Sequence, residues 1–337
     1  MPASWLSRAD QSPDRQRDPE KAEHLDLPPY RPTAIPPPDR SILMILNPHA
    51  GRGRARKQSR ALPQVARGLG WETELWETDH AGHEVDLARR AVEERWPVVV
   101  AVGGDGTVHG VVNGLLSAGP SETVFGHVPI GTGNDFAKTV GLDKARHPEH
   151  NLELVLSGSV TALDLGTVIG EYFVNGFGIG FTAEVVRNTF EYRRIRGFAL
   201  YFASVLRTFR TFKMPTLDVV SFEHEQNGPI MLVEVSIGKT AGGGFKLTPD
   251  ADPTDGLLDV CLIGEVGITY FLRHVHHIMS GTHTELPPVR IYQSTRVQVA
   301  SRAGPLPVHL DGELRFPDAT NFVVDIAPAG LRALCAV

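Results

Sequence analysis

Two glycine-rich turns constrain the fold of this chain more than any other feature of its sequence. They read Gly-Gly-Asp-Gly-Thr over 103–107 and Gly-Thr-Gly-Asn-Asp over 131–135, and each follows an apolar run and precedes a helical pattern. The first run, 98–102, is continuous and rich in β-branched residues, which is typical of a strand buried on both faces. A strand, a glycine turn and a helix start together present free backbone N–H groups and a positive dipole end to a phosphate. The pattern therefore predicts a phosphate-binding edge of a parallel sheet.

The first turn also carries a carboxylate, Asp105, which by itself disfavours a bare phosphate. A bridging cation removes this conflict, so the turn points to a nucleotide polyphosphate with Mg2+. One such turn alone would more often be a tight connection that needs glycine. Two turns that both carry Asp and Thr, at the carboxyl ends of neighbouring strands, favour a ligand site, because open α/β sheets bind ligands at that edge.

The chain divides into an extension, two predicted domains and a short tail. Residues 1–40 are rich in Pro, Asp, Arg and Glu and poor in apolar residues, so we predict a disordered extension there. Alternating strand and helix patterns over 41–163 predict a doubly wound parallel α/β nucleotide domain. Short alternating apolar runs over 164–327 predict a mostly antiparallel β domain. Residues 328–337 would form a C-terminal tail that could pack on the first domain.

Local signals within the predicted β domain indicate one hairpin and one helix. The pair Asn227-Gly228 is expected to join strands over 217–222 and 230–237 as a hairpin. The helical pattern over 198–212 mixes apolar residues with arginines. A helix that faces the core is the more frequent meaning of such a pattern. A wall of an apolar groove, or contact with a membrane surface, also stays open.

An acidic segment precedes a glycine turn in the second half of the chain. Asp250, Asp252 and Asp255 stand before Gly256, at a short spacing that resembles the start of a calcium loop whose first position is Asp250. An EF-hand is excluded because Cys261 occupies the twelfth position, where that loop needs Glu. A smaller Mg2+ site made by Asp252, Asp255 and a backbone carbonyl stays open, and so does an Asx-turn before a strand.

Two further carboxylates, Asp311 and Glu313, flank Gly312 between two apolar strands. An Asp-Gly pair in this position predicts a hairpin turn. Because a hairpin tip projects its side chains, the two carboxylates could also hold a metal or accept a hydroxyl proton.

Composition and missing motifs exclude several classes of function. The net charge of −6 argues against a protein that coats nucleic acid along its surface. The sequence has no Walker-type phosphate loop, no protein-kinase motif set and no Gly-x-Ser-x-Gly elbow. Its two cysteines, Cys261 and Cys335, lie in or beside apolar runs, so we expect core residues rather than a disulfide, in keeping with a reducing cytoplasm. We find no transmembrane run and no signal-peptide pattern.

Taken together, these motifs resemble those of the diacylglycerol kinase catalytic family, in its bacterial lipid kinase branch related to sphingosine kinases. The Gly-Asp-Gly-Thr run is shared with NAD kinases and phosphofructokinases, so it indicates only the superfamily. The run Pro-Ile-Gly-Thr-Gly-Asn-Asp-Phe-Ala over 129–137 is much more specific and favours the lipid kinases. The matching residues follow the family's order from 41 onward: Asn47-Pro48 with Gly51, 103–107, 129–137, Asp255-Gly256 and Asp311-Gly312-Glu313.

The resemblance implies an α/β nucleotide domain, a β-sandwich domain and ATP in the cleft between them. Asp105 would help to hold a catalytic Mg2+, and Asp135 would join that metal network. His109 stands where many members have Asn. The residues that would contact ATP are Asn47, Pro48, His49, Ala50, Gly51, Thr78, Gly103, Gly104, Asp105, Gly106, Thr107, Val108, His109, Thr132, Gly133, Asn134 and Asp135.

In the second domain, the resemblance implies a structural Mg2+ held by Asp252, Asp255 and the Leu257 carbonyl. Glu313, with Asp311 beside it, would match the proton acceptor of the reaction. Together with Asp105, these two carboxylates are the expected catalytic residues.

The function implied by the resemblance is that of an ATP-dependent lipid kinase with a diacylglycerol-like acceptor. It would act in the cytoplasm, transiently at the inner face of the membrane, on a lipid presented there and without a nucleic-acid partner. A homodimer stays open. The alternatives are an NAD kinase-like enzyme that acts on a soluble dinucleotide, and a non-catalytic protein that binds nucleotide or lipid.

Overall fold

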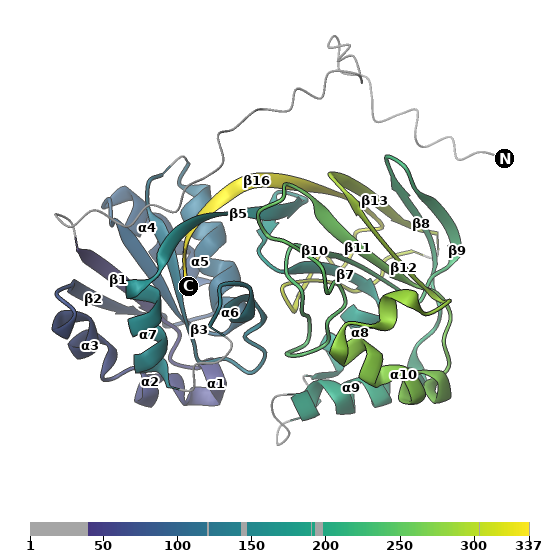
Figure 1. Ribbon diagram of the computed structural model, residues 1–337, viewed down its shortest axis with the longest axis horizontal. Coiled ribbons are helices and arrows are strands. Elements are labelled where there is room, and N and C mark those ends of the chain that lie inside the picture. Colours follow the sequence, from purple (N-terminus) through teal and green to yellow (C-terminus); the bar gives the residue numbers. More distant parts are fainter. Residues whose placement is uncertain are drawn as a thin grey trace, which may run out of the picture. The chain divides into compact units, whose positions relative to one another are not determined.

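The computed structural model describes residues 40–119, 121–142, 147–189, 191–192, 198–302 and 304–336. Except for Arg40, the extension predicted over 1–40 lies outside these residues. The described part of the chain folds into an α/β domain and an antiparallel β-sandwich that share one long sheet (Figure 1). The predicted fold class is confirmed.

The α/β domain is built on four parallel strands in the order β2-β1-β3-β4. Every residue of β3 is buried, because side chains from other elements cover both of its faces. The elements of this domain are β1 (Ser41–Leu46), α1 (Ala50–Gly53), α2 (Ala55–Gln58), α3 (Leu62–Gly68), β2 (Glu72–Glu77), α4 (His83–Glu93), β3 (Val98–Gly103), α5 (Asp105–Ser117), β4 (Val124–Pro129), α6 (Asp135–Thr139) and α7 (Pro148–Ser157).

The sandwich packs a six-stranded sheet, in the order β12-β11-β10-β7-β14-β15, against one end of the long sheet. The rings of Phe177 and Phe322, one from each sheet, lie 5.5 Å apart in the core between them. Helices α8, α9 and α10 cover the other face of the six-stranded sheet. The elements are β5 (Ser159–Val168), β6 (Glu171–Phe173), β7 (Gly176–Gly180), α8 (Phe181–Thr189), α9 (Phe198–Thr211), β8 (Thr216–Ser221), β9 (Glu225–Pro229), β10 (Leu232–Ser236), β11 (Leu258–Ile263), α10 (Ile268–Ser280), η2 (His283–Glu285), β12 (Val289–Ser294), β13 (Arg296–Ser301), β14 (Val308–Leu310), β15 (Glu313–Arg315) and β16 (Asn321–Cys335).

One long strand, β16, passes from the sandwich into the α/β sheet (Figure 1). Its first residues pair with β13, and its later residues pair with β5 and, at Ala333, with Phe125 of β4. Leu331 and Leu334 are buried in the core of the α/β domain. The end of the chain therefore completes the sheet on which the glycine turns stand.

The two hairpin predictions have different outcomes. Asn227-Gly228 lies inside β9, whose partner is β8, and the chain instead reverses where the Ser221 N–H donates to the His224 carbonyl over 2.8 Å. The apolar run 230–237, which was expected to pair with 217–222, instead forms β10 of the six-stranded sheet, so the prediction is wrong. Burial of this run in that sheet outweighs the turn preference of Asn227-Gly228. The Asp311-Gly312 hairpin is confirmed, with Leu310 paired to Glu313 and φ values of 52° and 83° at its two turn residues.

Both cysteines are free, and Cys261 is buried, as predicted. No helix among the described residues is long and apolar enough to cross a membrane.

Candidate active site

Three loops meet at the carboxyl edge of the parallel strands: a first loop over 47–51 and the two glycine turns over 103–107 and 131–135. Glycine residues allow them to contact one another. Gly103 pairs with Pro129 at the ends of β3 and β4, which brings the two glycine turns together. A Cβ on Gly131 would lie 2.5 Å from the Gly104 Cα, so neither turn tolerates a side chain there. Gly51 has a φ of 57°, and a Cβ on it would lie 2.5 Å from the Ile130 carbonyl oxygen. The first loop is thereby packed against the second turn.

A polar cleft opens above these loops, between the α/β domain and the β14–β15 hairpin. Within the cleft, the Asn47 side-chain amide donates to the Thr107 hydroxyl over 3.3 Å and joins the first loop to α5. The predicted ATP contacts that line the cleft are Asn47, His49, Ala50, Gly51, Thr78, Gly104, Asp105, Gly106, Thr107, His109, Thr132 and Gly133.

The structure places the other predicted ATP contacts around the cleft rather than on its lining. Gly103 lies beneath Thr107, because a Cβ on it would be 2.3 Å from that hydroxyl oxygen. Asn134 has a left-handed backbone and turns its side chain back to accept a hydrogen bond from Gly131 N over 2.8 Å. Asp135 faces a second cavity. Pro48 and Val108 are buried.

Asp105 and Asp135 bring two carboxylates together at the inner end of the cleft. A Cβ on Gly133 would lie 2.9 Å from Asp105 Oδ2 and 3.5 Å from Asp135 Oδ2, so the two groups face the same small space. Burial, reinforced by the negative charge of Asp135, raises the pKa of Asp105 to about 7. Asp135 itself accepts hydrogen bonds from Gly243 N at 2.8 Å and Lys138 Nζ at 2.9 Å. Two buried carboxylates with unfavourable mutual charge form a donor set that suits Mg2+.

A second, apolar cavity begins at these carboxylates and runs between the six-stranded sheet and helices α8, α9 and α10. Its walls are mainly aliphatic and aromatic, with Val205 and Phe209 from α9 and Phe271 from α10. Helix α9 thus both packs on the core and lines a cavity, which combines the two interpretations left open for 198–212. The cavity and the polar cleft share Asp105, Tyr201, Asp311 and Gly312 in their linings.

The Asp311 carboxylate is fixed by four hydrogen bonds. Its Oδ1 accepts from Asn175 N at 2.8 Å and Gly176 N at 3.1 Å, and its Oδ2 accepts from Val174 N at 3.2 Å. The His109 ring lies 2.9 Å from the same Oδ2 through Nδ1. With both oxygens occupied, Asp311 is better suited to positioning the hairpin than to accepting a proton.

His109 connects this carboxylate to a surface ion pair. Its Nε2 lies 3.4 Å from Glu171 Oε2, to which Arg315 Nε donates over 3.0 Å. Burial alone would lower the pKa of His109, but the hydrogen bonds to Asp311 and Glu171 outweigh it and raise this pKa to about 9. His109 is therefore positively charged at neutral pH, and it links α5, β6 and the β14–β15 hairpin. Its ring faces these two carboxylates. The sequence predicted only a contact with ATP and did not predict this structural role.

Glu313 lies over the first turn of α5. A Cβ on Gly106 would be 2.6 Å from Glu313 Oε1, so the carboxylate occupies the space beside this glycine. Burial raises the pKa of Glu313, although the charges of Arg315 and His109 oppose the shift. A carboxylate of raised pKa beside the glycine turn has the properties of a proton acceptor.

The acidic segment 252–257 lies away from this cleft, beside β5. Asp252 Oδ1 accepts from Thr254 N over 3.0 Å, which is the Asx-turn that the sequence allowed. Asp255 accepts from Leu257 N at 2.9 Å and from the Gln293 side chain at 3.0 Å. Burial raises the pKa of the neighbouring Asp259 to about 6, and the charges of Asp255, Asp250 and Asp252 add to this shift. The local excess of carboxylates also fits an oxygen-bound cation.

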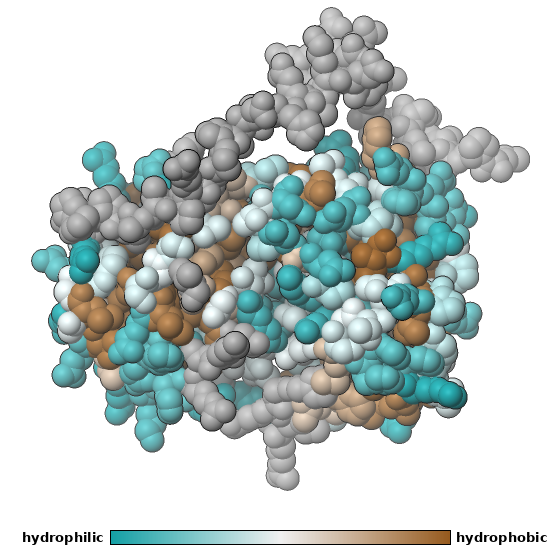
Figure 2. Space-filling view, viewed as in Figure 1, coloured by the Kyte–Doolittle hydropathy of each residue, from teal (hydrophilic) through white to brown (hydrophobic). Residues whose placement is uncertain are grey.

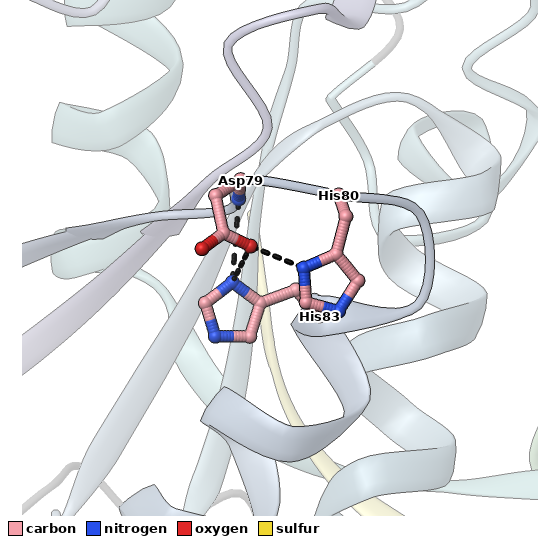
Figure 3. A group of neighbouring side chains, drawn as sticks. All are labelled: Asp79, His80 and His83. Atoms are coloured by element: carbon pink, nitrogen blue, oxygen red, sulfur yellow. Dashed lines mark hydrogen bonds and ion pairs between the residues drawn. The ribbon is translucent and has the colours of Figure 1, made fainter.

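A third cluster, Asp79, His80 and His83, stands at the rim of the cleft (Figure 3). Both imidazole rings turn toward one oxygen of the Asp79 carboxylate, and the rings stack with centroids 4.8 Å apart. Because Asp79 and His80 are exposed and the three side chains bond to one another, we assign the cluster no ligand.

Sequence reasoning missed several residues that line the site. Tyr201 stands between cleft and cavity, and Glu171 and Arg315 support His109. They belong to no motif. The pairing of β6 with β5, and of β14 with β7 and β15, places Glu171 and Arg315, and the packing of α9 on the six-stranded sheet places Tyr201.

Comparisons with known proteins agree with this arrangement. Residues 41–168 match the diacylglycerol kinase catalytic domain, and residues 176–335 match the YegS C-terminal NAD kinase beta sandwich-like domain. A diacylglycerol kinase of Bacillus subtilis is 28% identical over 275 residues, which cover 80% of this chain and 88% of the relative. A Pseudomonas fluorescens protein named "Probable lipid kinase YegS-like" is 31% identical over 227 residues, covering 67% of this chain and 73% of the relative. The fold is also similar to a crystal structure of a diacylglycerol kinase from Bacillus anthracis, with a TM-score of 0.68, 18% identity and coverage of 88% of this chain and 98% of that chain.

The charged state of His109 predicts how stability depends on pH. Since its folded pKa of about 9 lies above the ordinary histidine value of 6.5, its contribution to stability is complete below pH 6.5 and is lost as pH rises through 9. We expect His109→Asn, which can reach only one of the two carboxylates, to cost about 1–3 kcal/mol of unfolding free energy at pH 6. The difference from the parent should shrink at pH 9.5, and denaturant unfolding at both pH values measures it.

His276→Asn, at an exposed position on α10, is the matched control and should cost less than about 0.5 kcal/mol at either pH. A cost for His109→Asn that is independent of pH between 6 and 9.5 would contradict the charged state assigned to His109.

Proposed function

This chain belongs to the diacylglycerol kinase catalytic domain family, and we propose that it transfers the γ-phosphoryl group of ATP to the hydroxyl group of a diacylglycerol-like lipid. The named relatives support a kinase that acts on lipids. The observation that carries the finer proposal is the meeting of a polar cleft and an apolar cavity at Asp105, Tyr201, Asp311 and Gly312. A kinase whose acceptor is a lipid needs such a junction, because one substrate is a polyanion and the other is mostly hydrocarbon.

On the nucleotide side, the two glycine turns and the Asn47 loop supply backbone N–H groups at the edge of the sheet. Helix α5 begins at Asp105, directly after the first turn, so its positive dipole end points into the cleft. This arrangement suits the triphosphate of ATP. It requires glycine where the loops contact one another, because a Cβ there would collide with the neighbouring loop.

On the lipid side, the apolar cavity and a nearby exposed surface support a lipid acceptor. Three apolar side chains of α10 are exposed beside the cavity: Ile268, Leu272 and Met279. Figure 2 shows apolar side chains along the lower edge of this face, where α9 and α10 lie in Figure 1. Such a surface would allow the cavity to receive a lipid from a membrane without a spanning helix.

In the proposed reaction, the lipid hydroxyl oxygen forms a bond to the γ-phosphorus as the bond from that phosphorus to the bridging oxygen of ADP breaks. Glu313 accepts the hydroxyl proton, since its pKa is raised and it lies beside the turn that would bind the phosphates. Mg2+ held by Asp105 and Asp135 would neutralise charge on the phosphates. Asp311 and His109 keep the hairpin that carries Glu313 against α5. The enzyme would act at the cytoplasmic face of a membrane.

The direct test is a transfer assay with labelled ATP and Mg2+, using diacylglycerol in mixed micelles and NAD as alternative acceptors. We expect label in the lipid product. Label in NAD alone would establish the NAD kinase-like alternative, and nucleotide or lipid binding without transfer to any acceptor would establish a binding protein.

The first variant tests the proton acceptor. Glu313→Gln keeps the size of the side chain and removes the base, so we expect turnover to fall about a hundredfold or more while ATP binding is retained. Turnover and nucleotide affinity should be measured on the same preparations.

Glu93→Gln, at an exposed position on α4, is the matched control and should leave turnover unchanged. Asp311→Asn should also lose activity, and it should melt at a lower temperature because an amide group would face three backbone N–H donors. Near-normal turnover in Glu313→Gln would place the base elsewhere.

The second variant tests the metal-binding carboxylates. Asp105→Asn should lower turnover about a hundredfold or more, since neutralisation of the phosphates depends on this group. Its melting temperature should equal or exceed that of the parent, because the substitution removes a charge held close to Asp135.

The same substitution at an exposed position of α4 outside the cleft, Asp86→Asn, provides the control and should leave turnover within about twofold of the parent. If Asp105→Asn retained most of its activity, Asp105 would have no part in the mechanism.

We further propose that Asp252, Asp255 and the Leu257 carbonyl hold a structural Mg2+. Binding energy at such a site adds to folding stability, so millimolar Mg2+ should raise the melting temperature by about 2–4 °C for each kcal/mol of binding. Asp255→Ala should abolish this rise, and Asp318→Ala, at an exposed position, should keep it. Equal melting of the parent with and without Mg2+ would exclude the site.

A further inference from the structure

One row of residues across the six-stranded sheet is polar, whereas its neighbours on the same face are apolar. Glu234 of β10 and His309 of β14 both lie opposite Gly178 of β7, one on each side of it. This row belongs to the face that α8, α9 and α10 cover, where nearby residues such as Leu232 and Cys261 are apolar. The sequence therefore places a carboxylate and an imidazole in an otherwise hydrophobic layer.

These polar groups are buried and lack partners. Glu234 is 1% exposed and His309 is 4% exposed. Glu234 Oε2, His309 Nδ1 and the Thr182 hydroxyl oxygen of α8 form no hydrogen bond with any of the described residues. His309 Nε2 lies 3.6 Å from Glu234 Oε2, which is within ion-pair distance but longer than a hydrogen bond. Buried groups of this kind are normally satisfied, so these atoms can bond to a polar group that enters the cavity.

Glycine leaves a recess in which the three side chains converge. A Cβ on Gly178 would lie 2.2 Å from His309 Nε2 and 2.5 Å from both Glu234 Oε2 and Thr182 Oγ1. Strand β7 alternates glycine with large apolar residues. Phe177 and Ile179 enter the sandwich core, and the glycines leave the other face of the strand without side chains. A side chain at position 178 would displace these three polar groups, so only glycine lets them converge here.

The recess belongs to the apolar cavity and lies close to the proposed reaction centre. Glu234, His309 and Thr182 line the cavity together with Asp311 and Gly312. Asp311 lies two residues after His309. Its N–H donates to the carbonyl of Gly176 over 2.9 Å, and Gly176 lies two residues before Gly178 in β7. A molecule with its hydroxyl near Asp311 and its chain in the cavity would therefore pass the recess.

We propose that Glu234, His309 and Thr182 bind a second polar group of the acceptor lipid, a hydroxyl or amino group next to the hydroxyl that receives the phosphoryl group. This inference rests on the proposed lipid kinase function and specifies its acceptor. A carboxylate oxygen without a partner needs a hydrogen-bond donor, whereas an ester offers only acceptors. Among lipid acceptors, the recess therefore favours those with a free vicinal hydroxyl or amine. In 1,2-diacylglycerol that position is esterified, so we expect it to be a slower acceptor of the same phosphoryl group.

The test compares three probes of equal chain length: 1-hexadecanol, 1,2-hexadecanediol and 2-amino-1-hexadecanol, in mixed micelles with Mg2+ and labelled ATP. For the parent, we expect kcat/KM for the diol or the amino alcohol to exceed that for the simple alcohol by about tenfold, as one good hydrogen bond to a charged group would give. In Glu234→Leu this ratio should fall to about one, with the KM for ATP unchanged. Glu225→Gln, at an exposed position on β9, is the control and should keep the parent ratio.

Thermal melting separates this role from a merely structural one. If Glu234 serves a ligand, removing a buried, unpartnered carboxylate should leave the melting temperature of Glu234→Leu equal to or above that of the parent. A lower melting temperature, with activity on all three probes reduced in parallel, would overturn the proposal. Glu234→Gln gives the same comparison of acceptors if the leucine variant does not fold.

Failure of the lipid kinase function can be recognised separately. If the parent phosphorylates neither these probes nor diacylglycerol, the proposed function is wrong, and binding of the same probes then tests the recess. The diol or amino alcohol should raise the melting temperature of the parent more than 1-hexadecanol does, and the difference should vanish in Glu234→Leu. Equal shifts in the parent would overturn the inference.

Discussion

The Asp311 carboxylate joins three parts of the chain that lie far apart in the sequence. Its oxygens accept hydrogen bonds from the backbone between β6 and β7, and the His109 ring reaches one of them from α5. A charged acceptor with several donors is among the stronger arrangements available inside a protein. The hairpin that carries Glu313 is thereby held against the helix that begins at Asp105. The geometry of the candidate site depends on this single group.

Around this connection, two glycine patterns solve two different packing problems. In the α/β domain, Gly51, Gly104 and Gly131 let loops approach one another and leave their backbone groups directed at a ligand. In the sandwich, Gly178 instead leaves room for the side chains of Glu234, His309 and Thr182, and it does so in an extended strand. The first pattern produces a polar cleft and the second a recess in an apolar cavity. The two spaces meet where the carboxylates lie, which suits transfer from a polyanion to an amphiphile.

The local signals in the sequence differ in how well they predicted structure. The alternation of strands and helices over 41–163, the 311–312 hairpin and the helix over 198–212 agree with the structure. These signals are strong because hydrophobic period and turn residues act over short distances. The Asn227-Gly228 pair failed because burial of 230–237 in the other sheet outweighed the preference of that pair for a two-residue turn. The assignment of His109 as a nucleotide contact missed its buried partners, since Asp311 lies 202 residues further along the chain.

The sequence by itself determined the fold class, the edge of the sheet where a ligand would bind and the set of carboxylates available for chemistry. Those features follow from periodicity, glycine turns and residue type, all of which are local. Only the tertiary structure decided that Asp311 is occupied by hydrogen bonds while Glu313 lies over the glycine turn. It also decided that Glu234 and His309 face each other across Gly178 beside an apolar cavity. Such relations depend on strand order and register, which are set by the packing of the whole core and by no short segment of the chain.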